Sequence, residues 1–316
     1  MATGPRISAV ISSWNRVDAV LANVKALKAG TRVPDEIVVV DNASSDDTVA
    51  RLADEHPDVR VVVTAHSDYG ACETFNIGFK AATGDWLTIM DDDVEATEGW
   101  LATLEQRLLA EPATTAMVSS RVVEPGMPDS YCAAEVAKGS YYASTFRGCG
   151  TLARKAALQQ AGWYDERFFI YGNERDLAAR VLGCGHRILQ CPDAVIHHST
   201  PFGMKAGKRS LYFHVRNFWL YAFKSCRWRD IAAMAFSLAG KARGKGSRVS
   251  DVATAGAHET ELAATGTMGL AQAVRDTPGA LVIVAKATGN ALLNLPYCLA
   301  RRRVVTHEDF RLPVGE

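Results

Sequence analysis

Several features that identify common protein classes are missing from this sequence of 316 residues. Its seven cysteines are scattered singly without any C-x-x-C pair, which argues against a disulfide framework or a zinc site. No run reaches about 18 uninterrupted apolar residues, so we expect no membrane-spanning helix. Basic and acidic residues balance at 35 each, so no net charge favours nucleic acid as a partner.

Other absences concern the N-terminus and the chemistry. The opening segment "MATGPRISAVISSWNR" has no long apolar core of a signal peptide, so a cytoplasmic protein is expected. The segment Ser12–Arg16 has no glycine, whereas nicotinamide-dependent oxidoreductases need Gly-x-Gly-x-x-Gly after the first strand. No convincing Ser-His-Asp or Cys-His arrangement is present, so the sequence does not indicate a protein nucleophile.

What is present is an alternation of two hydrophobic periods over the first hundred residues. Short continuous apolar runs predict strands, and segments with apolar residues at helical spacing lie between them. Strands buried on both faces and alternating with helices predict an α/β fold with a doubly wound, mostly parallel sheet. The expected strands are 7–11, 36–40, 60–63 and 86–90, and the main expected helices are 17–29, 73–82, 98–110 and 211–224.

Polar residues follow three of these strands, and ligands of such sheets bind at the carboxyl ends of the strands. They are Ser12–Asn15, the pair Asp41-Asn42, and Asp91–Asp93. Two unit charges about 4 Å apart cost on the order of 1 kcal/mol in water and about 4 kcal/mol near a protein surface. Three adjacent aspartates therefore indicate a compensating charge, and Mg²⁺ or Mn²⁺ prefers such oxygen ligands. A solvated acidic turn is the alternative.

The composition divides the rest of the chain. We expect a catalytic domain over residues 1–225, with a nucleotide-binding half at about 1–115 and an acceptor-side half at about 116–225. A mainly helical C-terminal extension is expected over 226–316. Within it, residues 241–269 are rich in Gly, Ala, Thr and Ser, as in a flexible linker.

Five motifs in the same order resemble those of family 2 glycosyltransferases with the A-type, nucleotide-diphospho-sugar transferase fold. They extend over about residues 6–220 and comprise "VISSWNR", "VVDNASSDDT" (39–48), "NIGFKAATGD" (76–85), Asp91–Asp93, and the stretch 149–185 followed by "CPDAVIHH" (191–198).

The resemblance implies a site for a nucleotide-diphospho-sugar. Asp41 is expected to bind the imide edge of a uracil or thymine base, with the turn of Ser13 and Trp14 beside it. Asp68 is expected to assist at the base or the ribose. The donor implied is thus a UDP- or dTDP-sugar.

The resemblance also implies a metal site for Mn²⁺ or Mg²⁺. Asp91 and Asp92 are expected near the ribose, and Asp93 is expected to be the principal metal ligand, with Asp91 and His198 as further candidates. His197 is a candidate for the donor and acceptor pocket, although a histidine in an apolar strand is often structural.

The catalytic base is where the sequence departs from the family pattern. Glu174 stands where the family usually has an Asp that deprotonates the acceptor hydroxyl, and a Glu can serve the same chemistry. Asp176 is the alternative, although it also suits the N-terminus of a helix. Gly148, Cys149 and Gly150 match a small-residue loop near the donor sugar, or form only a turn.

The function implied is an inverting, metal-assisted single displacement from the nucleotide-sugar to an acceptor hydroxyl, with Glu174 as general base. A glycan, a lipid-linked glycan or a small molecule would serve as acceptor, and a homo-oligomer is compatible with the sequence. Two alternatives remain: a catalytically silent nucleotide-sugar-binding module, and a sugar-nucleotide pyrophosphorylase. The latter should show a Gly-rich, basic loop after the first strand, which is missing.

The apolar segment 279–303 lies outside these motifs and ends in three arginines. Core packing or an oligomer contact is favoured, because the segment contains a proline and two asparagines in its apolar stretch. Peripheral contact with the inner face of a membrane, with the arginines at anionic lipid, is the alternative.

Overall fold

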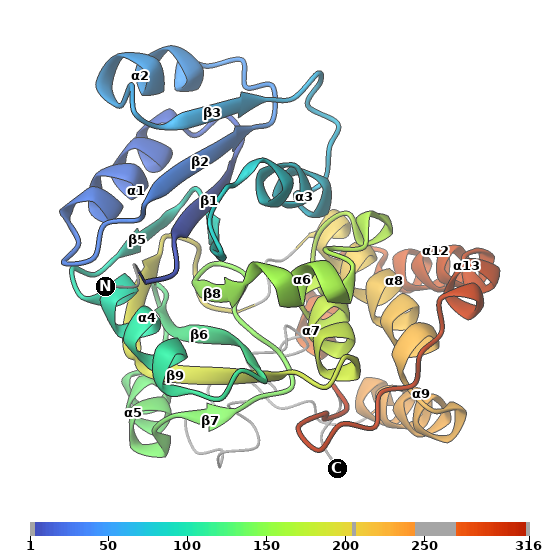
Figure 1. Cartoon of the computed structure of the whole chain (residues 1–316). Coiled ribbons are helices and arrows are strands. Elements are labelled where there is room, and N and C mark those ends of the chain that lie inside the picture. Colours follow the sequence, from blue (N-terminus) through green and yellow to red (C-terminus); the bar gives the residue numbers. More distant parts are fainter. Residues whose placement is uncertain (1–3, 204–206, 244–269, 314–316) are drawn as a thin grey trace.

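A central nine-stranded sheet organises the chain, with the strand order β3-β2-β1-β4-β8-β6-β9-β5 and β7 paired to β9 (Figure 1). The computed structural model describes residues 4–203, 207–243 and 270–313. The first half of the sheet is parallel, because β1 pairs with β2 and β4, and β2 pairs with β3. Its strands are β1 (Ile7–Ser13), β2 (Glu36–Asp41), β3 (Arg60–Val63) and β4 (Trp86–Asp91).

The second half of the sheet is mixed. The short strand β8 is antiparallel to both β4 and β6, and it joins the two halves, whereas β6 and β9 are parallel. β5 and β7 run antiparallel to β9. The strands of this half are β5 (Val94–Ala96), β6 (Thr115–Val123), β7 (Tyr141–Tyr142), β8 (Thr151–Arg154) and β9 (Arg187–His198).

Helices cover both faces of the sheet, as a doubly wound fold requires. Alternate residues of β1 show this: Val10 packs in the same cluster as Phe75 and Phe79 of α3, and Ile11 packs with α1 and α4 on the other face. The helices between β1 and residue 225 are α1 (Val17–Ala29), α2 (Thr48–Glu55), α3 (Ala71–Ala81), α4 (Trp100–Ala110), α5 (Asp129–Lys138), α6 (Lys155–Ala161), α7 (Asn173–Gly183) and α8 (Lys208–Ser225), with a 3₁₀ turn η1 (Glu166–Phe168).

The C-terminal region is helical and lies beside α8, at the edge of the molecule away from β1–β3 (Figure 1). It contains α9 (Trp228–Arg243), α11 (Leu270–Asp276), α12 (Ala280–Leu293) and α13 (Leu295–Ala300). Small side chains make the contact with α8, since Ala280 and Ala287 pack with Leu211 and Val215. None of the helices within the described ranges combines the length and the apolarity that crossing a bilayer requires.

The expected α/β fold with a mostly parallel sheet and a helical C-terminal region is confirmed. The four expected strands appear, and β1, β2 and β4 run one or two residues further toward their carboxyl ends. The strands of the second half of the sheet, among them the antiparallel strand β8, were not among the expected strands, and α9 continues to Arg243, into the expected linker. The rest of the expected linker, residues 244–269, lies outside the described residues.

The approach of α3 to the sheet depends on Gly78. A Cβ atom at this position would lie 2.5 Å from Cγ1 of Val10 and 2.9 Å from Cγ2 of Val40. Both valines are fully buried in central strands, so neither can move aside without disturbing the sheet. Glycine therefore sets the distance between this helix and the sheet that carries the polar strand ends.

Replacing Gly78 by alanine should destabilise the protein by about 1–3 kcal/mol, because the added methyl group overpacks the core. Urea unfolding measures the change. The control is Gly289→Ala in α12, where a Cβ meets nothing within 4 Å. Alanine is the better helix former, so the control should be neutral or stabilising by up to about 1 kcal/mol. Equal stability of Gly78→Ala and the unsubstituted protein would contradict the tight approach.

Candidate active site

Three strand ends meet at one edge of the parallel half-sheet. Ser13 of β1 is in register with Asp41 of β2, and Ser12 is in register with Asp91 of β4. The loops beyond are tied together as well, because the side chain of Asn15 accepts a hydrogen bond from the backbone N–H of Ser45 at 2.7 Å. The polar strand ends found in the sequence therefore lie together at one edge of the sheet.

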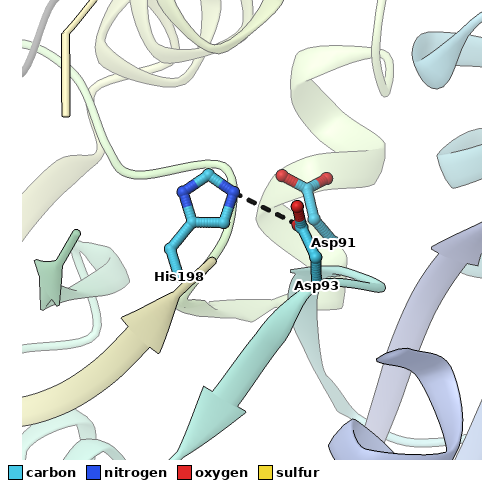
Figure 2. A group of neighbouring side chains, drawn as sticks. All are labelled: Asp91, Asp93 and His198. Atoms are coloured by element: carbon cyan, nitrogen blue, oxygen red, sulfur yellow. Dashed lines mark ion pairs between the residues drawn. The ribbon is translucent and has the colours of Figure 1, made fainter. Parts of the chain in front are cut away.

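Asp91, Asp93 and His198 form a cluster at this edge (Figure 2). Each offers a ligand atom, and these atoms all lie within 4.8 Å of one another. The turn between β4 and β5 supplies the aspartates, and the pairing of β5 with β9 places His198 opposite Val94, next to Asp93. Two carboxylates and an imidazole, held by rigid strands, are a donor set that suits a divalent cation such as Mn²⁺.

Protein cations offset part of the negative charge. Nη1 of Arg16 lies 2.8 Å from Oδ2 of Asp93, and Nε2 of His198 lies 3.2 Å from Oδ1 of the same residue. On its other side, Nδ1 of His198 is 2.9 Å from Oε1 of Glu124. A carboxylate behind the second ring nitrogen is the usual support for a metal-binding histidine, because it fixes the tautomer and the ring orientation.

The three aspartates differ in acidity because their surroundings differ. Burial raises the pKa of Asp91 to about 7, and burial together with the charge of Asp93 raises the pKa of Asp92 to about 6. For Asp93 burial acts in the same direction, but the hydrogen bond and charge of His198 and the charge of Arg16 outweigh it and lower the pKa to about 2. Burial would lower the pKa of His198, but its bonds to Asp93 and Glu124 raise it to about 10.

Asp41 is fully buried at the end of β2. Its Oδ2 accepts a hydrogen bond from the N–H of Ser44 at 2.9 Å, whereas its Oδ1 accepts none from the described residues. Next to it, the side chain of Asn42 donates to the carbonyls of Ser67 and Tyr69 and so holds the following loop at the strand end. That loop carries Asp68, whose side chain is 93% exposed.

Ser13 and Trp14 border the carboxylates. Ser13 is buried, and the indole of Trp14 is 51% exposed, so an apolar ring is open to solvent beside the strand ends. The backbone N–H of Trp14 lies 3.3 Å from Oδ2 of Asp92, which ties the end of β1 to the acidic turn.

Glu174 lies in the first turn of α7, against the loop of Gly148, Cys149 and Gly150. A Cβ on Gly148 would lie only 2.5 Å from Oε1 of Glu174, so glycine is needed for the carboxylate to occupy this place. Burial raises the pKa of Glu174, and its negative charge in turn contributes to the raised pKa of Asp91 and of Cys149. The loop and the base candidate are thus within electrostatic range of the acidic cluster.

The backbone just before α7 is strained. Phe169 and Tyr171 have φ values of 64° and 65°, in the left-handed region that side chains other than glycine rarely adopt. One buried side chain holds this loop, since the amide of Asn217 on α8 donates to the carbonyls of Phe168, Ile170 and Tyr171 at 2.7–2.8 Å. Asn217 therefore determines where α7, and with it Glu174, begins.

Asp176 has a different environment. It is almost fully buried, with Oδ1 2.6 Å from Nζ of Lys224 and Oδ2 2.8 Å from Nη2 of Arg180. Lys224 also pairs with Asp165 at 2.5 Å, so Asp176 belongs to a buried ion-pair network between α7 and α8. The carboxylate of Asp176 is thus held by two cations and lies in the first turn of α7, the helix-terminus position suggested by the sequence.

His197 is exposed, and neighbouring strand residues point to opposite faces of a sheet, so it faces away from His198. The candidate site therefore does not include it. Three residues at the site were missed: Arg16, Glu124 and Asn217. Glu124 directly follows β6, so the strand-end argument that found Asp41 could have found it. Asn217 gave no signal, because only the fold brings it to the loop.

Comparison with known sequences finds similarity to glycosyltransferases. The model of glycosyl transferase family 2 matches residues 8–147, which include the polar strand ends and the loop that precedes Gly148. Galactofuranosyltransferase GlfT1 of Mycobacterium tuberculosis is 28% identical over 216 residues, which cover 61% of this chain and 69% of that protein.

Solved structures show the same fold at low sequence identity. GalNAc-T7 with UDP, GalNAc and Mn²⁺ superposes with a TM-score of 0.60 at 14% identity, covering 80% of this chain and 54% of that chain. The mannosyltransferase PcManGT of Pyrobaculum calidifontis, in complex with GDP-Man and Mn²⁺, has a TM-score of 0.54 at 19% identity and covers 95% of this chain and 84% of that chain.

If Asp91, Asp93 and His198 bind a divalent cation, binding of Mn²⁺ at pH 7 should release between about one and two protons. His198, with a pKa of about 10, is protonated at that pH, and Asp91, with a pKa of about 7, is half protonated. The affinity for Mn²⁺ should therefore rise with pH. Calorimetry in buffers of different ionisation enthalpy counts the protons.

Two histidine variants make this count specific. His198→Gln should reduce the release by about one proton and weaken binding, since it removes a ligand and its proton together. His197→Gln, on the opposite face of the same strand, should leave both unchanged. If His198→Gln released as many protons as the unsubstituted protein, the histidine would not be a ligand.

Proposed function

Because this chain belongs to glycosyl transferase family 2, we propose that it transfers a sugar from a UDP- or dTDP-sugar to an acceptor hydroxyl, with inversion at the anomeric carbon. The observation that carries the proposal is the cluster of Asp91, Asp93 and His198 at the ends of the parallel strands, with Glu174 within electrostatic range of Asp91. Of the two structural neighbours cited above, one was solved with UDP and Mn²⁺ and the other with GDP-Man and Mn²⁺, which supports a nucleotide-diphospho-sugar as donor and a divalent cation.

The nucleotide would lie across the ends of β1 and β2. Oδ1 of Asp41 accepts no hydrogen bond from the described residues, and the imide N–H of uracil or thymine would supply one. Ser13 and Trp14 flank this position, and the exposed indole offers a flat apolar surface to a base or sugar. Asp68 on the neighbouring loop would contact the base or the ribose, and Asp92 would contact the ribose.

The acidic cluster would hold the diphosphate end of the donor through a divalent cation. Asp93, Asp91 and His198 are the proposed ligands, with Glu124 orienting the histidine. The chemistry that Mn²⁺ or Mg²⁺ supplies at such a site is stabilisation of the charge on a departing nucleoside diphosphate. Arg16, which lies 2.8 Å from Asp93, can contribute a second positive charge to the same diphosphate.

Glu174 is proposed as the general base that takes the proton of the acceptor hydroxyl. Burial raises its pKa toward the range in which a carboxylate accepts a proton efficiently, and it is partly accessible beside the Gly148 loop. Asp176 is less suitable, because Lys224 and Arg180 already bind its carboxylate. The acceptor oxygen would attack the anomeric carbon directly, so no covalent sugar–protein intermediate is needed.

A panel of UDP-, dTDP- and GDP-sugars with Mn²⁺ or a chelator tests the proposal. A transferase should release nucleoside diphosphate from UDP- or dTDP-sugars, with water as acceptor when no other is present, and only with the metal. Asp93→Ala should lower this release by at least about a hundredfold, because the metal-dependent charge stabilisation is lost. His197→Gln is the matched control and should retain full activity.

The panel also separates the alternatives. A silent binding module would bind the nucleotide-sugar without releasing nucleoside diphosphate. A pyrophosphorylase would form nucleoside triphosphate when pyrophosphate is added. Either result would overturn the proposed transfer.

Glu174→Gln should lower the rate of donor turnover by about 10²–10⁴-fold without weakening nucleotide binding, because it removes the base and keeps the shape. Asp176→Asn should act mainly on stability, by roughly 1–3 kcal/mol, since it takes a charge partner from buried Lys224. Nucleotide-release rates and urea unfolding distinguish the two effects. A large rate loss in a stable Asp176→Asn protein, with Glu174→Gln active, would reverse the assignment.

A further inference from the structure

Ile283 and Val284 of α12 are half-buried against α8, but several other large apolar side chains of this helix face solvent. Ala280, Ala287 and Ala291 are buried toward the protein, whereas Leu281 and Leu293 are 80% and 81% exposed. A helix that only packs against a core places its large apolar side chains inward. The large exposed residues, which we call the apolar stripe, are Leu281, Val282, Leu292, Leu293 on α12 and Leu299 on α13.

Positive charge accompanies the apolar stripe. Arg301 and Arg303 directly follow α13 and are exposed, and Lys286 is exposed within α12. Arg301 and Arg303 line, with Ala300, part of a cavity of about 660 Å³ between α6, α7 and the C-terminal segment. The sequence from Ala280 to Arg303 contains no acidic residue. The C-terminal segment thus combines exposed apolar residues along α12, a helix about 20 Å long, with basic residues directly after α13.

An exposed tryptophan lies next to the arginines that follow α13. The guanidinium of Arg302 is 4.2 Å from the ring centre of Trp228 at the start of α9, which brings that indole next to the arginines. Trp228 is half exposed, and Arg227 and Arg229 on either side of it are exposed as well. Tryptophan beside arginine is typical of groups that lie at the level of lipid headgroups.

From this surface we propose that the C-terminal helices α12 and α13 bind the surface of an anionic lipid bilayer. The apolar stripe enters the boundary between headgroups and acyl chains, and Arg301 and Arg303 contact lipid phosphates. The helices lie on the membrane and do not cross it. The inference does not depend on the proposed transferase activity.

A second copy of the chain fits this surface less well. In a two-fold symmetric dimer the same surface meets itself, so the basic ends of both copies would share one interface. No acidic residue between Ala280 and Arg303 is available to pair with them. The phosphates of anionic lipids supply the missing negative charge.

Co-sedimentation with vesicles tests the proposal on the full chain. The protein should bind vesicles of equal parts phosphatidylglycerol and phosphatidylcholine, and bind vesicles of phosphatidylcholine alone much more weakly. Arg301→Gln with Arg303→Gln should lower the affinity for the anionic vesicles by about fivefold per arginine. High salt should have a similar effect.

The apolar contribution is tested by Leu292→Ser with Leu293→Ser, which should reduce binding to the anionic vesicles by roughly tenfold or more. The control is Leu109→Ser on α4, which removes a leucine that is 59% exposed elsewhere on the surface. Thermal unfolding and Mn²⁺ binding should be unchanged in these variants, which keeps a failure here separate from failure of the active-site proposal.

Two results would overturn the inference. One is binding to anionic vesicles that is undetectable, or that is the same in the Leu292→Ser, Leu293→Ser protein as in the control. The other is a dimer in light scattering that the double leucine variant converts to monomer, with no vesicle binding by either form. The second result would assign the apolar stripe to self-association.

Discussion

Repulsion between three adjacent carboxylates at the end of β4 is the constraint around which the site is arranged. Asp91 is the last residue of the buried strand β4, and Asp92 and Asp93 follow it directly and are themselves buried, so the three carboxylates lie close together. The protein answers with cations from elements far apart in sequence, Arg16 from the first strand-end loop and His198 from the last strand. That compensation is partial, since the pKa values of Asp91 and Asp92 stay raised.

This residual charge gives the site its chemical character. A site that holds more negative charge than its own cations balance has an affinity for further positive charge. A divalent ion would supply that charge and could bind a diphosphate at the same time. If a divalent cation binds to these side chains, His198 must first lose its proton, because its pKa is about 10. Cation binding and proton release would then be linked at the same three side chains.

The sequence was informative where local physics decides the outcome. Continuous apolar runs located the strands of the parallel half, and polar residues after them located Asp41 and Asp91–Asp93. Sequence named His198 as a metal-ligand candidate but also kept His197 for the pocket, because the faces that the two side chains take depend on the register of β9 against β5, and a shift of one residue exchanges them. Nor could it show that Asp176 pairs with Lys224, since only the packing of α7 on α8 brings those charges together.

The amide of Asn217 has a wider consequence than its three hydrogen bonds suggest. The acidic cluster takes its position from the sheet, whereas the loop before α7 is held from two sides. The backbone N–H of Cys72 on α3 bonds to the carbonyl of Phe169, and Asn217 holds the same loop from α8, the helix on which α12 also rests. A shift of α8 would therefore be transmitted through Asn217 to the turn that carries Glu174.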